Sequence, residues 1–199
     1  MTHELILAFL AYAFVTSITP GPNNAMLLAS GVNFGLKASV PHILGVNIGF
    51  AVLILSVGLG LGGVFEALPI LHDAMKYVGA AYLIYLAWKI AGSGVSEADR
   101  GRRVPLTFMQ AAAFQWVNPK AWIMAIGAIA TYTQADGFLA KAVLVTILFS
   151  IVNAPCIIAW AAVGTALRGV LSKPIWLRVF NVAMALMLVA SLYPIFRAR

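Results

Sequence analysis

The longest uncharged run, Leu5–Leu36, most constrains how this chain can fold. As one straight helix it would measure about 48 Å, whereas the hydrocarbon core of a bilayer is about 30 Å thick. Ala38–Phe65 and Ala142–Leu167 are also uncharged, and only 10% of the 199 residues are charged, against about 25% in soluble domains. The apolar residues are continuous and do not alternate with polar ones, which favours membrane helices over a barrel.

The pattern predicts an all-α, polytopic membrane protein with six transmembrane helices. We expect the spans at about 5–35, 40–65, 70–92, 106–132, 140–167 and 176–196. A polar linker, 93–105, divides a single transmembrane domain into half 1 (1–92) and half 2 (106–199). Because each half has three spans, equivalent halves would insert with opposite orientations, as in the inverted repeats of many secondary transporters.

The basic residues are scattered at span ends, as in a membrane protein, and the net charge of +7 therefore does not indicate nucleic-acid binding. Placing the linker in the cytoplasm puts eight Lys and Arg residues inside and four outside. The sequence thus predicts that both termini lie outside the cytoplasm. The expected surroundings are membrane lipid and a small-molecule substrate.

A break is expected in the first span, at Pro20, Gly21 and Pro22, because each proline removes a backbone donor and clashes with the preceding turn. Asn23 and Asn24 follow directly. Backbone groups freed at membrane depth need protein or a water-filled cavity around them. The break is interpreted as part of a substrate site; the alternative is a kink whose asparagines bind neighbouring helices.

The fourth span carries a second break, at Asn118, Pro119 and Lys120. A lysine inside a span is costly unless it finds an anion, carbonyl groups or water. Lys120 is therefore a candidate partner for a substrate carboxylate; alternatively, its long side chain reaches the interface. Trp116 and Trp122 could line the same cavity or anchor the helix at the interface.

Asn47 and Asn153 each stand alone in an apolar span, where they either bind another helix or face the substrate path. Gly45 and Gly49 have the small-xxx-small spacing that lets helices approach closely. A homodimer through this glycine-rich second span is compatible with the composition.

No cofactor, metal site or catalytic constellation is indicated. The histidines do not cluster with metal-ligand spacing, there is no glycine-rich phosphate loop, and Cys156 fits a small packing residue. The spans contain no obvious carboxylate for proton coupling, which leaves Glu66 or His42 as candidates.

Taken together, the six spans, Thr19-Pro20-Gly21-Pro22-Asn23 and Asn118-Pro119-Lys120 resemble the LysE/RhtB family of bacterial amino-acid exporters over essentially the whole chain. The resemblance implies ion-driven efflux of an amino acid across the cytoplasmic (inner) membrane. It also makes Pro20, Gly21, Pro22, Asn23, Asn118, Pro119 and Lys120 candidate site residues. Many members have an aspartate where this chain has Asn23, and the missing charge weakens the case for a cationic substrate.

The leading hypothesis is a secondary exporter of an amino acid or related small metabolite. The substrate-binding residues would be Pro20, Gly21, Pro22, Asn23, Asn24, Asn47, Asn118, Pro119, Lys120 and Asn153. A passive channel and a non-transporting accessory membrane subunit are the alternatives, and an enzyme is not expected.

Overall fold

The computed structural model describes residues 1–61, 69–92, 104–133 and 137–193, which form helices and contain no β-strand. The helices of the first half are α1 (His3–Ile18), α2 (Pro22–Phe34), α3 (Val40–Ser56), the π-helical turn η1 (Val57–Leu61) and α5 (Pro69–Ala91). Those of the second half are α7 (Phe108–Gln115), α8 (Pro119–Tyr132), α9 (Phe138–Leu167), the 3-10 turn η2 (Val170–Ser172) and α10 (Pro174–Ala190).

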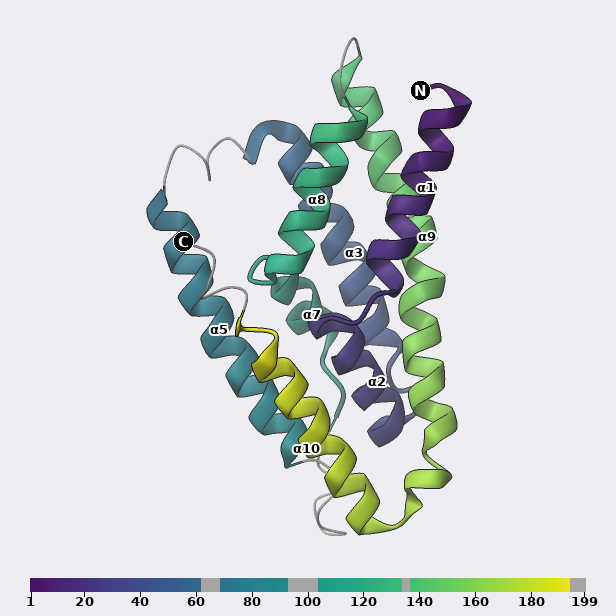
Figure 1. The fold of residues 1–199 in the computed structure, drawn as a ribbon, viewed down its shortest axis with the longest axis vertical. Helices are drawn as coiled ribbons and strands as arrows, with labels where there is room; N and C mark the ends of the chain where they lie inside the picture. The colour runs from purple at the N-terminus through teal and green to yellow at the C-terminus, as the bar shows by residue number, and fades with distance from the viewer. Residues whose placement is uncertain (62–68, 93–103, 134–136, 194–199) are drawn as a thin grey trace.

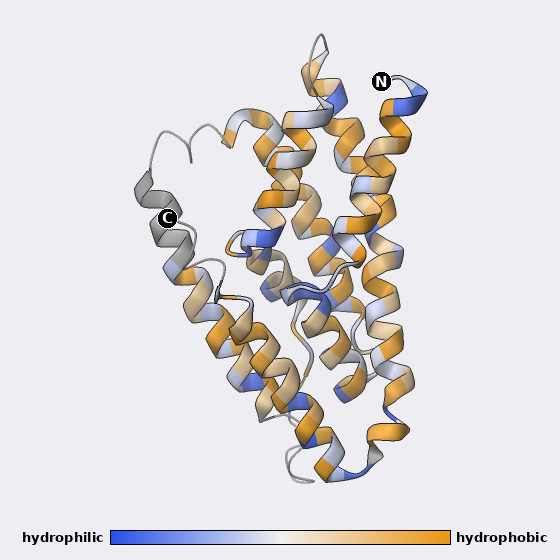
Figure 2. Ribbon diagram, in the orientation of Figure 1, coloured by the Kyte–Doolittle hydropathy of each residue, from blue (hydrophilic) through white to orange (hydrophobic). Residues whose placement is uncertain are grey.

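Both predicted breaks are present. The first predicted span is two helices, α1 and α2, bent by 55°. The fourth is also two helices, α7 and α8, which are separated by Trp116–Asn118. Figure 1 shows both interruptions near the middle of the bundle, and Figure 2 shows hydrophilic residues gathered there between mainly hydrophobic stretches.

Close glycine contacts hold the half-helices α2 and α7 against long helices. A Cβ added at Gly31 of α2 would lie 2.1 Å from the Ala161 carbonyl oxygen of α9, and one at Gly164 would lie 2.2 Å from that of Leu28. On the other side, Gly45 and Gly49 bring α3 against the backbone of α7. The packing function predicted for Gly45 and Gly49 is therefore confirmed.

The outer surface suits lipid. Large apolar side chains are exposed on several helices, including Trp88, Ile123, Ile151 and Leu186, an arrangement that would be unfavourable in water. By length and composition alone, Val40–Leu61 and Phe138–Leu167 can each cross a membrane, and the bent pair α1–α2 can form a third span. The fold is that of an all-α polytopic membrane protein; the count of six spans stays a prediction.

The remaining span limits differ modestly from those predicted. The described helix of the second span runs from Val40 to Leu61 and has a non-helical φ of 102° at Gly60, and the predicted end of this span at 65 lies outside the described residues. The last helix covers Pro174–Ala190, against the predicted 176–196. Residues 93–103 of the linker and Glu66 lie outside the described residues.

Basic residues gather at the lower end of the molecule in Figure 1, around the turn between α9 and α10. A Cβ at Gly35 would lie 2.8 Å from the Arg168 guanidinium, so the turn between α2 and α3 is at the same end. Lys37, Lys173 and Arg178 are also exposed in this region. Positive charge favours the cytoplasmic side of a membrane, which supports the predicted orientation.

Candidate functional site

The first break is organised by its own sequence. Helix α1 ends at Ile18, Thr19 is extended with φ −64° and ψ 145°, and Pro22 is the first residue of α2. The Asn24 side-chain nitrogen donates to the carbonyl oxygens of Ser17 and Thr19, both at 2.8 Å. Asn24 thus satisfies acceptors at the end of α1 that a continuous helix would bind internally.

The second break is stabilised in a similar way. The Asn118 side-chain oxygen accepts a hydrogen bond from the Lys120 backbone N–H at 3.2 Å and caps α8, with Pro119 at its first position. The indole nitrogen of Trp122 donates to the Trp116 carbonyl at 2.9 Å. Trp116 and Trp122 therefore stabilise the break, and neither lines the cavity described below.

Lys120 joins the two breaks. Its ammonium donates to the Thr19 carbonyl at 2.8 Å, to the Thr19 hydroxyl at 3.0 Å and to the Pro20 carbonyl at 3.3 Å. Gly21 permits this approach, since a Cβ there would lie 2.8 Å from Lys120 Cδ. The carbonyls freed by the first break are the acceptors that make a lysine tolerable at this depth.

A reciprocal amide pair provides a second connection. Asn23 Nδ2 donates to Gln115 Oε1 at 2.8 Å, and Gln115 Nε2 donates to Asn23 Oδ1 at 3.2 Å. Gln115 is fully buried and also donates to the Ala111 carbonyl at 2.9 Å. These bonds fix the start of α2 against the end of α7.

A cavity lies where these elements meet, and we call it the central cavity. It contains about 360 Å³ of space between atoms, part of which is open to the outside. Its lining residues are Thr16, Ser17, Gly21, Asn23, Asn24, Val46, Phe50, Asn118, Lys120, Ala121, Met124, Asn153 and Ile157.

The lining mixes polar and apolar side chains and carries one positive charge. Lys120 is the charged residue among the lining residues, and Ser17 Oγ is buried without a hydrogen-bond partner among the described residues. Asn24 and Asn153 use their amide nitrogens for bonds within the protein, which leaves their side-chain oxygens as acceptors. A cation, a free hydroxyl and neutral acceptors in one small space can hold a molecule bearing both a carboxylate and an ammonium group.

Six of the predicted residues line this cavity: Gly21, Asn23, Asn24, Asn118, Lys120 and Asn153. The three prolines Pro20, Pro22 and Pro119 shape the breaks without lining it. Asn47 lies behind the wall, where its Oδ1 accepts from Asn153 Nδ2 at 2.8 Å.

Sequence analysis missed several lining or supporting residues: Thr16, Ser17, Phe50, Gln115 and Met124. Ser17 and Gln115 had a usable signal, because each is a polar residue in an apolar stretch directly before a break. Phe50 and Met124 had none, because a cavity-lining apolar residue has the same local pattern as a core residue.

Two broken helices that meet at a cavity inside an apolar bundle are the arrangement found in many secondary transporters. Comparison with known proteins identifies the kind of transporter. The chain belongs to the LysE type translocator family, whose model matches residues 14–191. It is an exporter of an amino acid or related small metabolite and a multi-pass protein of the bacterial cytoplasmic membrane, as the resemblance implied.

Among similar proteins are the cysteine/O-acetylserine efflux proteins of Escherichia coli (strain K12) and Shigella sonnei (strain Ss046). Each is 31% identical over 204 residues, covering 98% of this chain and the full length of that protein. No solved structure matches the chain significantly.

Proposed function

We propose that the central cavity is the site where the exported amino acid binds, with Lys120 taking its carboxylate. The observation that carries this proposal is the bridge from the Lys120 ammonium to the Thr19 and Pro20 carbonyls, at a cavity that several other polar side chains line. A carboxylate is a stronger acceptor than a carbonyl for an ammonium group, so a bound substrate would compete with the bridge. Asn23, Asn24 and Asn118 would hold the rest of the molecule.

The lining favours a small amino acid with an uncharged side chain. The lining residues include no carboxylate that could pair with a cationic side chain. Asn23 lines the cavity and is neutral, whereas an aspartate at this position could pair with such a side chain. Phe50 and Met124 offer apolar contact. The similar efflux proteins are named for cysteine and O-acetylserine, and this substrate class fits a cavity whose lining includes no carboxylate.

Binding and movement would be coupled through the bridge. When Lys120 turns to the substrate, the bonds from α8 to the first break are lost, and α8 loses one of its connections to the first broken span. A zwitterion carries no net charge, so a membrane potential, worth about 2.3 kcal/mol per charge per 100 mV, acts only through a coupled ion. We therefore expect export to depend on an ion gradient, with protons as the first candidate.

Export from dipeptide-loaded cells tests the function. Cells expressing the protein are expected to accumulate cysteine or O-acetylserine outside faster than vector cells, and a protonophore should stop this export. Lys120→Ala should lower the initial rate at least about tenfold, the equivalent of about 1.4 kcal/mol. Lys37→Ala, which removes an exposed lysine far from the cavity, is the matched control.

Each other result has a defined meaning. Flux that is unaffected by the protonophore but lost in Lys120→Ala would indicate a passive channel. Wild-type export by Lys120→Ala would remove the proposed substrate site. If membranes contain the protein but no amino acid is exported faster than by vector cells, a non-transporting accessory subunit becomes the better description.

A further inference from the structure

A second cavity lies between α2, α3, α5 and the segment before α7, toward the basic end of the molecule. It contains about 490 Å³ of empty space. Most of its wall is apolar, including Met26, Phe34, Leu86 and Leu106. Four lining residues bear polar groups: Ser30, Asn33, His42 and Lys89.

His42 is the polar residue that packing leaves unsatisfied. It is 1% exposed, and neither ring nitrogen has a hydrogen-bond partner among the described residues. A buried polar group without a partner costs about 1–3 kcal/mol. Both ring nitrogens are shielded in this arrangement, so the ring must turn toward the cavity before a bound molecule can supply the missing partner and this energy is recovered.

The neighbouring polar groups already have partners. Ser30 Oγ and Ser39 Oγ are hydrogen-bonded to each other at 2.8 Å. Asn33 Nδ2 donates to Asn181 Oδ1 at 2.9 Å and also to the Ala29 carbonyl at 2.8 Å. His42 is therefore the lining residue whose polar atoms lack a hydrogen-bond partner among the described residues. Lys89 lines the same cavity.

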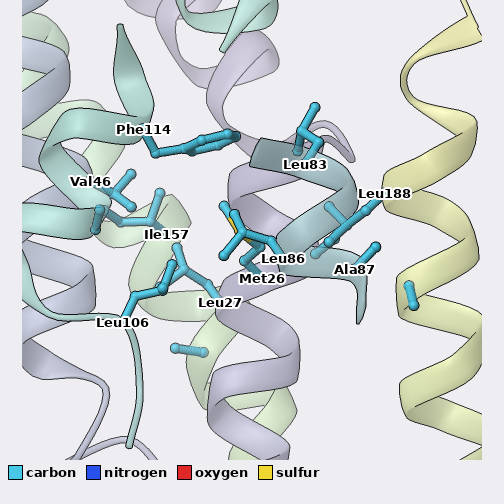
Figure 3. Packing of buried hydrophobic residues seen from close by; sticks show 14 of the residues in the cluster. Met26, Leu27, Val46, Leu83, Leu86, Ala87, Leu106, Phe114, Ile157 and Leu188 are labelled. Carbon is cyan, nitrogen blue, oxygen red and sulfur yellow. The ribbon is translucent and has the colours of Figure 1, made fainter. Parts of the chain in front are cut away.

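The two cavities are neighbours along α3. His42 lines the second cavity, and Val46, one helical turn later, lines the central cavity. A layer of buried apolar side chains lies between them, and Figure 3 shows it from close by. Val46 and Ile157 of this layer face the central cavity, whereas Met26, Leu86 and Leu106 face the second.

We propose that the second cavity is a second binding site for the exported amino acid, in which a His42 ring N–H donates to the substrate carboxylate. Lys89 supplies positive charge to the same space, and the apolar wall accommodates a small uncharged side chain. The site lies at the basic end, which the charge distribution assigns to the cytoplasm. The substrate thus binds here first and reaches the central cavity when the apolar layer parts.

This inference rests on the proposed function, since both sites take the same substrate, but the two can be tested apart. Single cysteines are introduced into a Cys156→Ala background, which removes the one native thiol. Ala29→Cys reports on the second cavity and Met124→Cys on the central cavity. Val170→Cys, exposed and outside both cavities, is the control. The purified protein is labelled with N-ethylmaleimide, with and without O-acetylserine.

O-acetylserine is expected to slow labelling at least about threefold at both cavity positions and to leave Val170→Cys unchanged. Adding His42→Met should abolish protection at Ala29→Cys only, and adding Lys120→Ala should abolish it at Met124→Cys only. His42→Asn, which keeps a donor, should retain part of the protection. His42→Met removes a buried group without a partner, so we expect it to fold. If Ala29→Cys does not fold or react, Leu106→Cys replaces it.

Protection at Met124→Cys alone would overturn the second site and leave the proposed function intact. Protection at Ala29→Cys alone would support the second site and remove the central one. Protection at Ala29→Cys that survives His42→Met would overturn the role of His42. Protection at neither position would overturn both sites.

Discussion

At the scale of single residues, Lys120 and Gly21 depend on each other. The ammonium of Lys120 reaches the Thr19 and Pro20 carbonyls only because the side chain crosses directly over Gly21, where a Cβ would lie 3.1 Å from Nζ. The φ of Gly21 is 180°, which other residues also adopt. This glycine is therefore required for space and not for backbone conformation.

Gly21→Ala is accordingly expected to impair transport more than folding. The added methyl group would displace a flexible side chain, so the amount of protein in the membrane should stay near wild type, whereas the export rate should fall several-fold. Export and membrane content measured on the same cells check this. Gly169→Ala, with no atom within 4 Å of its added Cβ, is the control. Unchanged export by Gly21→Ala would mean that the position of Lys120 is not critical.

At the scale of elements, the half-helices differ in how tightly they are held. Helix α2 is packed against α9 through Gly31 and Gly164, and α7 is packed against α3 through Gly45 and Gly49. Such close approach of helix backbones is a main source of packing energy in membranes. We therefore expect α2 and α7 to keep these contacts while α1 and α8 move during transport.

Gly164→Ala should destabilise the fold. Its methyl group would lie 2.2 Å from the Leu28 carbonyl oxygen, a backbone atom that cannot rotate away. Overpacking of this kind costs about 1–3 kcal/mol. We expect a lower melting temperature for the purified protein in detergent, with Gly169→Ala unchanged. Equal melting temperatures for the two variants would contradict the α2–α9 contact.

At the scale of the whole molecule, charge and packing support one orientation. The exposed residues Lys37, Arg168 and Lys173 lie at one end, and the N-terminus lies at the other (Figure 1). Helix α9 connects the two ends, and its 30 residues would measure about 45 Å, enough to cross a membrane. The end of α9 that bears Arg168 is therefore expected to face the cytoplasm.

Thiol labelling of intact cells tests this orientation. In the Cys156→Ala background, Leu139→Cys places an exposed thiol in the first turn of α9. Val170→Cys places an exposed thiol shortly after the last residue of the same helix, Leu167. A membrane-impermeant maleimide should label Leu139→Cys in intact cells and Val170→Cys only after permeabilisation. The reverse pattern would invert the topology and place the second cavity on the outer side.

Much of the fold could be predicted because it follows from local rules. Prolines inside a run too long for the membrane predict a break, and the small-xxx-small spacing of Gly45 and Gly49 predicts a close helix contact. The pairing of Asn23 with Gln115 could not be predicted, because it depends on how two distant breaks meet in space. The same is true of Lys120, whose acceptors are 100 and 101 residues away in the sequence.

Several expectations remain predictions. Equivalence of the two halves is one of them: α1 contacts α9 as α7 contacts α3, but α2 packs much more extensively against α9 than α8 does against α3. A homodimer through the second span is untested, and Gly45 and Gly49 already contact α7 within the chain. Proton coupling has no assigned residue.

The bridge at the centre of the molecule has a consequence for how such a protein diversifies. Two of the three acceptors of Lys120 are main-chain carbonyls, which every amino acid supplies. Substitutions at Thr19 would therefore leave most of the lysine's anchoring intact. Substitutions at Phe50 or Met124 would change the shape of the central cavity next to Lys120. If Lys120 binds the substrate carboxylate as proposed, substitutions of a few apolar side chains can change which metabolite is exported without changing how its carboxylate is bound.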